Sequence, residues 1–473
     1  MKKTVVILGA GVSGLGVGWL LSRDGYDVVV LEKEKEIGGL AATFQRSGYA
    51  FDYGPHNFHT HFPEVEDFVF RRLGVPMEFK PLQSAKIFFG GKSVPYPIKG
   101  LRALTVLDPW TALRGSADFI FTRLKLRLER PHEKSFKDWI THRYGRTLYQ
   151  IYFGPYAEKV WGLPGEKIDL VVASKKVPTA SLLELLIRAL FRTGPRRLHS
   201  EDTETVRSYY PEAGIGAVSE KLAAGILARG CRILMNAVPR TIHHQNGSVT
   251  EIEYLQDRGP GRLQADLLIN TIPLNEFVTL LGGSLPASRL QFRSMVLVYL
   301  IVGRERVFDV PWMYFNDPAD PDVLFNRAYE VGNFSRGMTP PGKSVLCLEI
   351  TCALDDQTWK TEADDLAASC IRYLERHGFF RRAEVEDAFI KRLPVAYPVF
   401  EVGYRSALRK HLDIVGRFAN VASIGRQGGF TYSNVDHCLA MAMDLQAFIK
   451  KDPGFENPDG FRTFQNSLIE KFG

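Results

Sequence analysis

The chain has 473 residues, of which 45% are hydrophobic and 24% are charged, the proportions of a soluble globular protein. This length exceeds what one core normally supports, so we expect more than one domain. The formal net charge of +7 favours anionic small molecules or membrane surfaces as partners. No recognised nucleic-acid-binding module accompanies the charge, which argues against a role on nucleic acid.

The cysteines and the amino-terminal segment indicate where the protein works. The five cysteines are scattered and contain no CxxC pair, so they predict buried thiols in a reducing compartment, with metal binding not expected. Met1, Lys2 and Lys3 lead directly into an apolar run, which leaves no room for a signal peptide. No apolar run approaches the roughly 20 residues that a membrane-spanning helix needs. We therefore expect a cytoplasmic protein.

The first pattern in chain order, residues 4–39, is typical of a βαβ unit: an apolar run, a glycine-rich turn, a helix of small residues and a second apolar run. The turn contains Gly9, Gly11 and Gly14 in GxGxxG spacing. We expect Gly9 to permit the tight turn, Gly11 to let the backbone approach a pyrophosphate, and Gly14 to let the helix pack on the sheet. The N–H groups at the start of the helix would then face the phosphates.

Glu32 ends the second apolar run. A carboxylate at this place can accept hydrogen bonds from both hydroxyls of an adenosine ribose, but it would repel a 2′-phosphate. The sequence therefore favours FAD or NAD over NADP. A GxGxxG turn alone is a weak signal, but here the strand, the helix, the second strand and the acid follow in register.

The continuation from Gly38 to Thr43, GGLAAT, resembles the second glycine pair of the amine oxidase and protoporphyrinogen oxidase class of flavoproteins, where this pair lines the FAD diphosphate. The resemblance implies tightly bound, non-covalent FAD, with NAD(P)H as a candidate external reductant. Covalent attachment is not expected, because no cysteine or histidine motif for it accompanies these blocks.

A second resemblance begins at residues 53–60, YGPHNFHT, which are similar to the YGxHxFHT block of the UDP-galactopyranose mutases. In that family the histidines lie beside the flavin ring, which implies that His59, or its neighbour His56, contacts the ring, with Asn57 beside them. Read without the resemblance, two histidines three apart also suggest a metal. No convincing further ligand set accompanies them, so we do not expect one.

Residues 76–204 have helical patterns with basic faces and few strand signals, and we expect an inserted, mainly helical lid. Within it, the run from Tyr156 to Gly162, YAEKVWG, resembles the YTEKxWG block of the mutases. An exposed tryptophan on a loop, Trp161, would stack on a uracil or sugar ring. The alternative is that Tyr156 and Trp161 are core aromatics.

Basic residues are dense in two parts of this region. They are Arg123, Lys125, Arg127 and Arg130, and then Arg192, Arg196 and Arg197. Solvated helix faces are one interpretation. Peripheral attachment to an anionic lipid surface is the other.

The chain then returns to the first domain and leaves it again. Residues 233–238 are predicted as a strand, whose Val238, by the resemblance, binds adenine through its backbone. Asn246 and Gly247 then predict a hairpin with a type I′ turn. Residues 276–414 alternate apolar runs with turns, and we expect an antiparallel sheet that forms the wall of a substrate cavity.

Three residues are assigned to a substrate diphosphate by the resemblance. The segment around Arg327 resembles the mutase segment that supplies an arginine to this group, and a guanidinium can hold a diphosphate by two parallel charge-assisted bonds. The segment around Tyr397 resembles one whose tyrosine also donates to it. Lys176 lies where the mutases carry a catalytically important arginine.

The last block, residues 424–437, has a GRxxxxxYxN pattern close to the final flavin block of the mutases. Arg426 would lie near the flavin and Tyr432 would reach the substrate phosphate. Asn434 replaces the aspartate of bacterial members. The start of the following helix would point its positive end at the flavin, where it stabilises a reduced, anionic form.

The predicted fold is α/β: a Rossmann-type FAD-binding domain (1–75, 205–275 and 415–473), a helical lid (76–204) and an antiparallel-sheet substrate domain (276–414). The predicted catalytic residues are Arg327, Arg426, His59 and Lys176. The predicted cofactor-binding residues are Gly9, Gly11, Val12, Ser13, Gly14, Glu32, Lys33, Gly38, Gly39, Leu40, His56, Asn57, Val238, Gly425, Arg426, Asn434 and Val435. The predicted substrate-binding residues are Tyr156, Trp161, Lys176, Arg327, Tyr397 and Tyr432.

Two functions compete. The first is isomerisation of a nucleotide-diphosphate sugar between pyranose and furanose forms, in which the N5 atom of reduced flavin acts as nucleophile without net redox change. The second is an oxidoreductase of the amine oxidase or protoporphyrinogen oxidase type, which oxidises a C–N or C–C bond. The first requires an anionic small-molecule substrate and a set of side chains that converge on its diphosphate.

Overall fold

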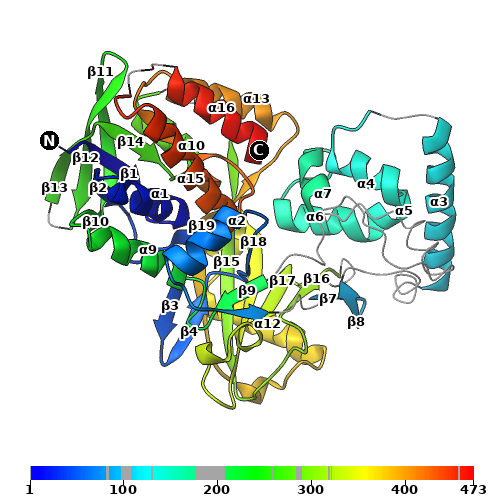
Figure 1. Cartoon of the computed structure of the whole chain (residues 1–473). Helices are drawn as coiled ribbons and strands as arrows, with labels where there is room; N and C mark the ends of the chain where they lie inside the picture. Colours follow the sequence, from blue (N-terminus) through cyan, green and yellow to red (C-terminus); the bar gives the residue numbers. More distant parts are fainter. Residues whose placement is uncertain are drawn as a thin grey trace. The chain divides into compact units, whose positions relative to one another are not determined.

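The computed structural model describes residues 2–80, 85–96, 108–128, 132–176, 208–257, 259–283, 290–317, 320, 322–455, 457 and 459–472 (Figure 1). The chain forms two compact units. The first comprises Met1–Lys80, Arg207–Gln291 and Arg405–Gly473, and the second comprises Pro81–Val206 and Phe292–Tyr404. The second unit contains most of both the predicted lid (76–204) and the predicted sheet domain (276–414). The division into three domains stays a prediction.

The core of the first unit is a parallel five-stranded sheet. Its strands are β1 (Thr4–Leu8), β2 (Asp27–Leu31), β10 (Arg232–Leu234), β14 (Leu267–Asn270) and β20 (Val421–Ser423). They lie in the order β10-β2-β1-β14-β20, and every neighbouring pair is parallel. Nearly every residue of β1, β2 and β14 is buried, as expected for a parallel sheet. The predicted α/β fold with a Rossmann-type unit is confirmed.

Helix α1 of this unit packs closely because of its glycines. The principal helices are α1 (Val12–Arg23), α9 (Ala217–Leu227), α15 (Val435–Lys451) and α16 (Gly460–Phe472). A Cβ added to Gly16 would lie 3.1 Å from a Leu439 methyl on α15, and one added to Gly18 would lie 3.1 Å from a methyl of Ile226 on α9. Larger residues at these two positions would push the helices apart.

Smaller elements complete the first unit. They are β3 (Thr43–Arg46), β4 (Tyr49–Asp52), β5 (Phe58–His59), β6 (Met77–Lys80), β9 (Ser208–Pro211), β11 (Val238–Gln245), β12 (Ser248–Gln256), β13 (Gly259–Gln264), α2 (Pro63–Asp67), α10 (Leu274–Leu280), α13 (Tyr404–Val415) and α14 (Gly425–Gly428). Strands β11, β12 and β13 form an antiparallel sheet. Asn246 and Gly247 join β11 to β12 with φ values of 51° and 75°, as the predicted hairpin turn requires.

The strand predicted over residues 233–238 is wrong in its extent. Strand β10 ends at Leu234, and Val238 begins β11, an antiparallel strand in another sheet. Asn236 turns the chain between them, because its φ of 53° is left-handed. Because residues 233–238 are apolar except for Asn236, the sequence carries little sign of this turn.

The second unit is built on a seven-stranded sheet. Its strands are β7 (Ala85–Phe89), β8 (Lys92–Tyr96), β15 (Gln291–Val302), β16 (Trp312–Phe315), β17 (Arg327–Glu330), β18 (Ser344–Cys352) and β19 (Val385–Val399), in the order β19-β15-β18-β17-β16-β7-β8. Strands β16 and β7 pair in parallel, whereas the pairs β15–β18, β18–β17, β17–β16 and β7–β8 are antiparallel.

The expectation of few strands in residues 76–204 is therefore corrected at its start. Strands β6, β7 and β8 all lie there, and β7 and β8 extend the sheet. Gly90 and Gly91 join β7 to β8 with φ values of 55° and 72°. A Gly-Gly pair between apolar runs is a hairpin signal that the sequence analysis overlooked.

The helices of the second unit are α3 (Pro109–Leu128), α4 (Phe136–Tyr144), α5 (Arg146–Leu148), α6 (Gly154–Trp161), α7 (Leu170–Lys176), α11 (Gln357–Lys360) and α12 (Ala363–Arg376). Helix α4 begins with a capping box, in which the Ser135 and Asp138 side chains each accept a hydrogen bond from the other's backbone N–H. Within the described residues, no helix combines the length and the apolar character that crossing a bilayer requires.

A buried carboxylate in the first unit, Asp52, links strands β3 and β9 and the segment before α9 through hydrogen bonds. Asp52 accepts hydrogen bonds from the Thr43 hydroxyl at 2.5 Å, from the Ile215 N–H at 3.3 Å and from the Tyr210 hydroxyl. The Thr43 hydroxyl oxygen in turn accepts from the Gly216 N–H at 2.8 Å. Burial raises the pKa of the Asp52 carboxyl to about 6, although these hydrogen bonds oppose the increase.

We expect Asp52 to make the stability of the first unit depend on pH. The pKa is about 6 in the folded chain and ordinarily 3.8, so the contribution to stability is complete below pH 3.8 and is lost as the pH rises to about 6. Asp52→Asn should remove this dependence, on the order of 3 kcal/mol. Urea unfolding of both proteins between about pH 4 and pH 7 measures it. A difference between the two unfolding free energies that is constant over this range would contradict the assignment.

Candidate functional site

Two glycine turns meet at the amino-terminal end of α1. The N–H of Gly38 donates to the carbonyl oxygen of Ala10 at 2.8 Å. A Cβ added to Gly39 would lie 3.4 Å from the Cα of Gly11. Gly9 and Gly38 have φ values of 98° and 101°, which other residues rarely adopt. The two glycine motifs of the sequence therefore form one continuous backbone surface.

A third turn reaches the same helix end from the other end of the chain. Gly425 has a φ of 84°, and a Cβ added to it would lie 2.4 Å from the Ser13 hydroxyl oxygen. Ser13 and its neighbour Val12 are buried in the first turn of α1. Within the described part of the chain no side-chain hydrogen bond caps this helix, whose N-cap residue is Gly11, so its first N–H groups and the positive end of its dipole face the three turns.

Gly11 and Gly14 differ in what surrounds them. A Cβ added to Gly14 would lie 2.0 Å from the carbonyl oxygen of Gly9, so the fold itself requires glycine there. A Cβ added to Gly11 meets nothing within 4 Å, and its φ of −75° suits any residue. The described part of the chain gives no reason for a glycine at position 11, whereas a bound pyrophosphate would.

Glu32 is fixed beside the first glycine turn. Its Oε2 atom accepts a hydrogen bond from the Ala10 N–H at 2.7 Å, and its Oε1 atom accepts one from the Glu34 N–H at 3.0 Å. Burial raises the pKa of the Glu32 carboxyl, while these two hydrogen bonds lower it. The Ala237 N–H donates to the Glu32 carbonyl oxygen at 2.8 Å, so Val238 follows directly after a contact with the predicted ribose acid.

The other predicted cofactor residues lie on the loops and helix ends of the first unit. Lys33 is exposed after β2, and Leu40 lies in the helical turn Gly39–Ala41. Asn57 precedes β5, whereas Asn434 and Val435 are the N-cap and the first residue of α15. Strand β5 contacts α15, which brings the histidine block and the last block together.

One of the two predicted histidines, His59, lies near an acidic residue that the sequence analysis did not assign, Asp436. Burial lowers the pKa of His59, while the Asp436 carboxylate nearby raises it. Asp436 is buried, and its Oδ1 atom lies 2.9 Å from Nδ1 of His437. Its Oδ2 atom is buried without a hydrogen-bond partner among the described residues. The Nδ1 atom of His56 lies 2.9 Å from the Gly54 carbonyl oxygen.

Arg426 and Tyr432 contact each other in the last block. The guanidinium carbon of Arg426 lies 4.8 Å from the centre of the Tyr432 ring, and Nη1 donates to the Ser433 carbonyl oxygen at 3.2 Å. Phe430, which is fully buried, has a φ of 50°. A left-handed bulky residue is strained, and such strain is found mainly at functional sites.

In the second unit, Arg327 forms a bidentate ion pair with Glu349. The Arg327 Nε atom lies 2.7 Å from Oε2 of Glu349, and Nη2 lies 2.8 Å from Oε1. Glu349 is 2% exposed and Arg327 is 23% exposed. Burial lowers the pKa of Arg327, but the Glu349 carboxylate outweighs it and the pKa is raised overall. The edge of the Arg327 guanidinium formed by Nε and Nη2 is thus used by Glu349, and the Nη1 edge carries the remaining donors.

Tyrosines surround this ion pair. Tyr314 lies opposite Arg327 in the β16–β17 register, and its ring is 6.2 Å from that of Tyr156. Tyr397 is close enough to raise the pKa of Arg327. Burial, followed by Tyr314, raises the pKa of Tyr156 well above its ordinary range. The predicted residues Arg327, Tyr156 and Tyr397 therefore form one cluster with an acid and a tyrosine that the sequence analysis missed.

The expected exposure of Trp161 is wrong. Trp161 is the last residue of α6 and is 7% exposed. Its ring lies 6.0 Å from Tyr397 and 6.4 Å from Phe400. Gly162, with a φ of 69°, ends the helix directly after Trp161, so the tryptophan belongs to the helix and not to a loop. Trp161 is therefore a buried aromatic residue, which is the alternative interpretation of the sequence.

Lys176 is the last residue of α7. Its side chain lies outside the described part of the chain, so its contact with a diphosphate stays a prediction. The basic residues Arg130, Arg192, Arg196 and Arg197 lie outside it as well.

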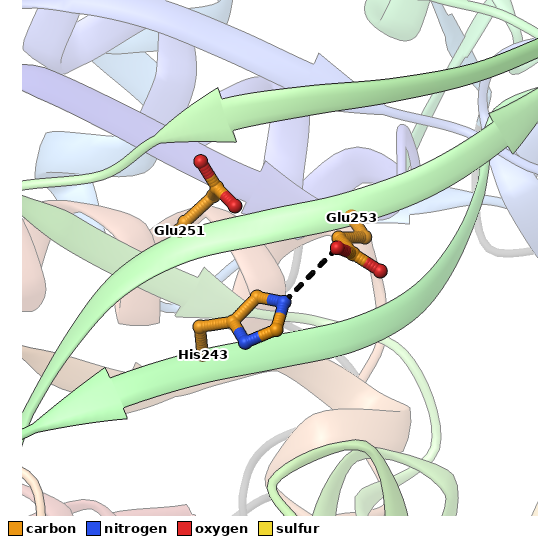
Figure 2. A group of neighbouring side chains, drawn as sticks. All are labelled: His243, Glu251 and Glu253. Carbon is orange, nitrogen blue, oxygen red and sulfur yellow. Dashed lines mark ion pairs between the residues drawn. The ribbon is translucent and has the colours of Figure 1, made fainter.

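A separate surface cluster lies on the β11–β12 hairpin. His243, Glu251 and Glu253 each have a possible ligand atom within 4.8 Å of the others, and Nε2 of His243 lies 3.2 Å from Oε1 of Glu253 (Figure 2). Arg262 contacts both acids, at 3.4 Å and 2.6 Å respectively. Because the Arg262 guanidinium already forms ion pairs with both carboxylates, we assign this cluster as a network of surface ion pairs.

Comparison with known proteins bears on the first unit directly. A family model described as an NAD(P)-binding Rossmann-like domain matches residues 7–73. The UDP-galactopyranose mutase of Mycoplasma pneumoniae is 31% identical over 177 residues, which are 36% of this chain and 43% of that protein. The chloroplastic protoporphyrinogen oxidase of Nicotiana tabacum is 27% identical over 174 residues, which are 36% of this chain and 31% of that protein. The chain thus matches less than half the length of these relatives.

Solved structures extend the likeness to the whole fold. A reduced UDP-galactopyranose mutase has a TM-score of 0.79 against this chain and covers 98% of both chains. The sequence identity is 18%, so this similarity shows a common fold.

Proposed function

We propose, from the relationship of this chain to the UDP-galactopyranose mutases and protoporphyrinogen oxidases, that it is an FAD-dependent enzyme. The main support for this cofactor is the space around Gly11. Three glycine turns meet at an uncapped helix end, and the one glycine that the fold does not require is where a pyrophosphate would lie.

The residues of the first unit fit this cofactor. The first N–H groups of α1 would bind the diphosphate, and Glu32 would accept hydrogen bonds from the adenosine ribose. His59 and the start of α15 would lie at the flavin ring, with the buried Oδ2 atom of Asp436 as an acceptor near them. When bound, reduced FAD supplies a nucleophilic nitrogen.

We propose further that the substrate is a nucleotide-diphosphate sugar, whose pyranose and furanose forms the enzyme interconverts. The support is the cluster around Arg327 in the second unit, where a guanidinium held by Glu349 lies among phenol groups. In this role the second donor edge of Arg327 binds a diphosphate oxygen, and Tyr156 and Tyr397 donate hydrogen bonds to the same group. Glu349 fixes the guanidinium in place, so little orientational freedom is lost on binding.

The second candidate is an oxidoreductase that removes a hydride from a C–N or C–C bond. The match to the tobacco protoporphyrinogen oxidase favours it, since that match covers as much of this chain as the match to the Mycoplasma mutase does. The two candidates make opposite demands on the oxidation state of the flavin.

The test is turnover of UDP-galactopyranose without oxygen. We expect product only after the flavin has been reduced with dithionite or NAD(P)H, because the electrons are not consumed in an isomerisation. UDP should inhibit the reaction by competing for the Arg327 cluster. Consumption of one oxygen molecule per product by an oxidised enzyme that millimolar UDP does not inhibit would refute the isomerase and leave the oxidoreductase.

A further inference from the structure

Helix α3 of the second unit has its large apolar side chains on its outer face. Five of them are exposed: Trp110 (77%), Leu113 (60%), Ile120 (59%), Phe121 (74%) and Leu124 (55%). Spacings of three, four and seven residues place them on one stripe along the helix. Among the described residues, these are five of the ten exposed large hydrophobic side chains, and a single helix carries them.

The inner face of α3 is held by the rest of the unit. The Asp118 carboxylate accepts a hydrogen bond from the Thr147 N–H at 2.6 Å, at the start of α5. Phe119 is 9% exposed, and Gly115 lies against Thr147. The helix is therefore anchored in an orientation that directs the apolar stripe outward.

The same helix is basic. Arg114 and Lys125 are exposed and alternate with the apolar stripe, and the sequence of α3 adds Arg123 and Arg127. The one acidic residue of the helix, Asp118, accepts a hydrogen bond from the Thr147 N–H within the unit. Tryptophan and phenylalanine next to lysine and arginine match the boundary between acyl chains and anionic headgroups.

We propose that α3 attaches this protein to the surface of an anionic membrane. The apolar stripe enters the boundary between headgroups and acyl chains, while Arg114 and Lys125 remain among the lipid phosphates. The positive charge of α3 favours an anionic membrane over a second copy of this chain, because two copies of the same basic helix would repel each other. The proposal is independent of the flavin chemistry, and a protein without FAD should attach as well.

The test of the apolar stripe is cosedimentation with vesicles made of equal parts phosphatidylglycerol and phosphatidylcholine. Trp110→Ser/Phe121→Ser should lower the partition coefficient by roughly tenfold or more, because two large apolar side chains leave the bilayer. Leu227→Ser/Leu354→Ser is the matched control, since both leucines are exposed outside α3, and it should bind as the unsubstituted protein does.

The test of charge uses Arg114→Glu/Lys125→Glu. This variant should bind the anionic vesicles at least tenfold more weakly, and the unsubstituted protein should bind pure phosphatidylcholine only weakly. Arg409→Glu/Lys410→Glu changes the net charge equally on exposed positions of α13 and should bind nearly as the unsubstituted protein does.

Several outcomes would overturn the proposal. They are failure of the unsubstituted protein to sediment with anionic vesicles, and equal loss of binding in a control and its test variant. A fall in the thermal unfolding temperature of Trp110→Ser/Phe121→Ser would show that the stripe packs within the chain. A concentration-dependent dimer that this variant abolishes, without vesicle binding, would show that the stripe joins two copies.

Discussion

Gly11→Val is expected to yield a folded protein without FAD. The Cβ of the new residue points into space that no described atom occupies within 4 Å, so the fold should tolerate it. The side chain would occupy the place of the pyrophosphate and keep the phosphates away from the N–H groups of α1. We expect FAD affinity to fall by at least roughly a hundredfold, about 3 kcal/mol. The measurement is the FAD released on denaturing the purified protein, beside its thermal unfolding temperature.

Gly14→Val is the matched control, because the same side chain there has a different neighbour. Its Cβ would lie 2.0 Å from the carbonyl oxygen of Gly9, inside the turn that begins α1. We expect this variant to lose stability by roughly 3 kcal/mol or more, or to fail to fold. If Gly11→Val retained FAD, or unfolded as readily as Gly14→Val, the three glycine turns at the start of α1 would not be the pyrophosphate site.

Local sequence was sufficient for the parts of the fold that neighbouring residues determine. Gly9 and Gly14 predicted the turn between β1 and α1, because Gly9 supplies the left-handed φ of the turn and Gly14 lies against the Gly9 carbonyl group, five residues earlier. Asn246-Gly247 predicted its hairpin for the same reason. Gly90-Gly91 is an equal signal for a hairpin, but the basic helical patterns that follow it in the sequence obscure it.

Contacts between distant residues could not be obtained in this way. Glu349 is the partner of Arg327, but nothing in either local sequence indicates that β17 pairs with β18 in the register that opposes them. The burial of Trp161 depends on Tyr397, more than two hundred positions away. Resemblance to known blocks supplied candidate roles for these residues and left their neighbours unknown.

The Arg327–Glu349 pair should be essential to substrate binding, with a separable effect on stability. Arg327→Lys keeps a positive charge but loses the planar fork, so we expect UDP to bind more weakly by roughly 1 to 3 kcal/mol. FAD content should not change, since the glycine turns belong to the first unit. Titration calorimetry with UDP and the FAD content of the same sample measure both effects.

Breaking the pair on the acidic side should chiefly cost stability. Glu349→Leu leaves the guanidinium of Arg327 without its carboxylate at a position that is 23% exposed, and we expect a loss of about 3 kcal/mol in the free energy of unfolding. Arg327→Leu/Glu349→Leu removes both charges, and apolar replacement of a buried pair is often neutral or stabilising. The double variant should therefore recover most of the stability.

The double variant separates the two roles of the ion pair. If Arg327 binds a diphosphate, the stable Arg327→Leu/Glu349→Leu protein should still fail to bind UDP, because its cation is gone although its fold is intact. UDP binding that returns together with stability would mean that the pair is structural and that the diphosphate site lies elsewhere. In that case the tyrosines around Arg327 would have no anion to bind, and the oxidoreductase would be the better assignment.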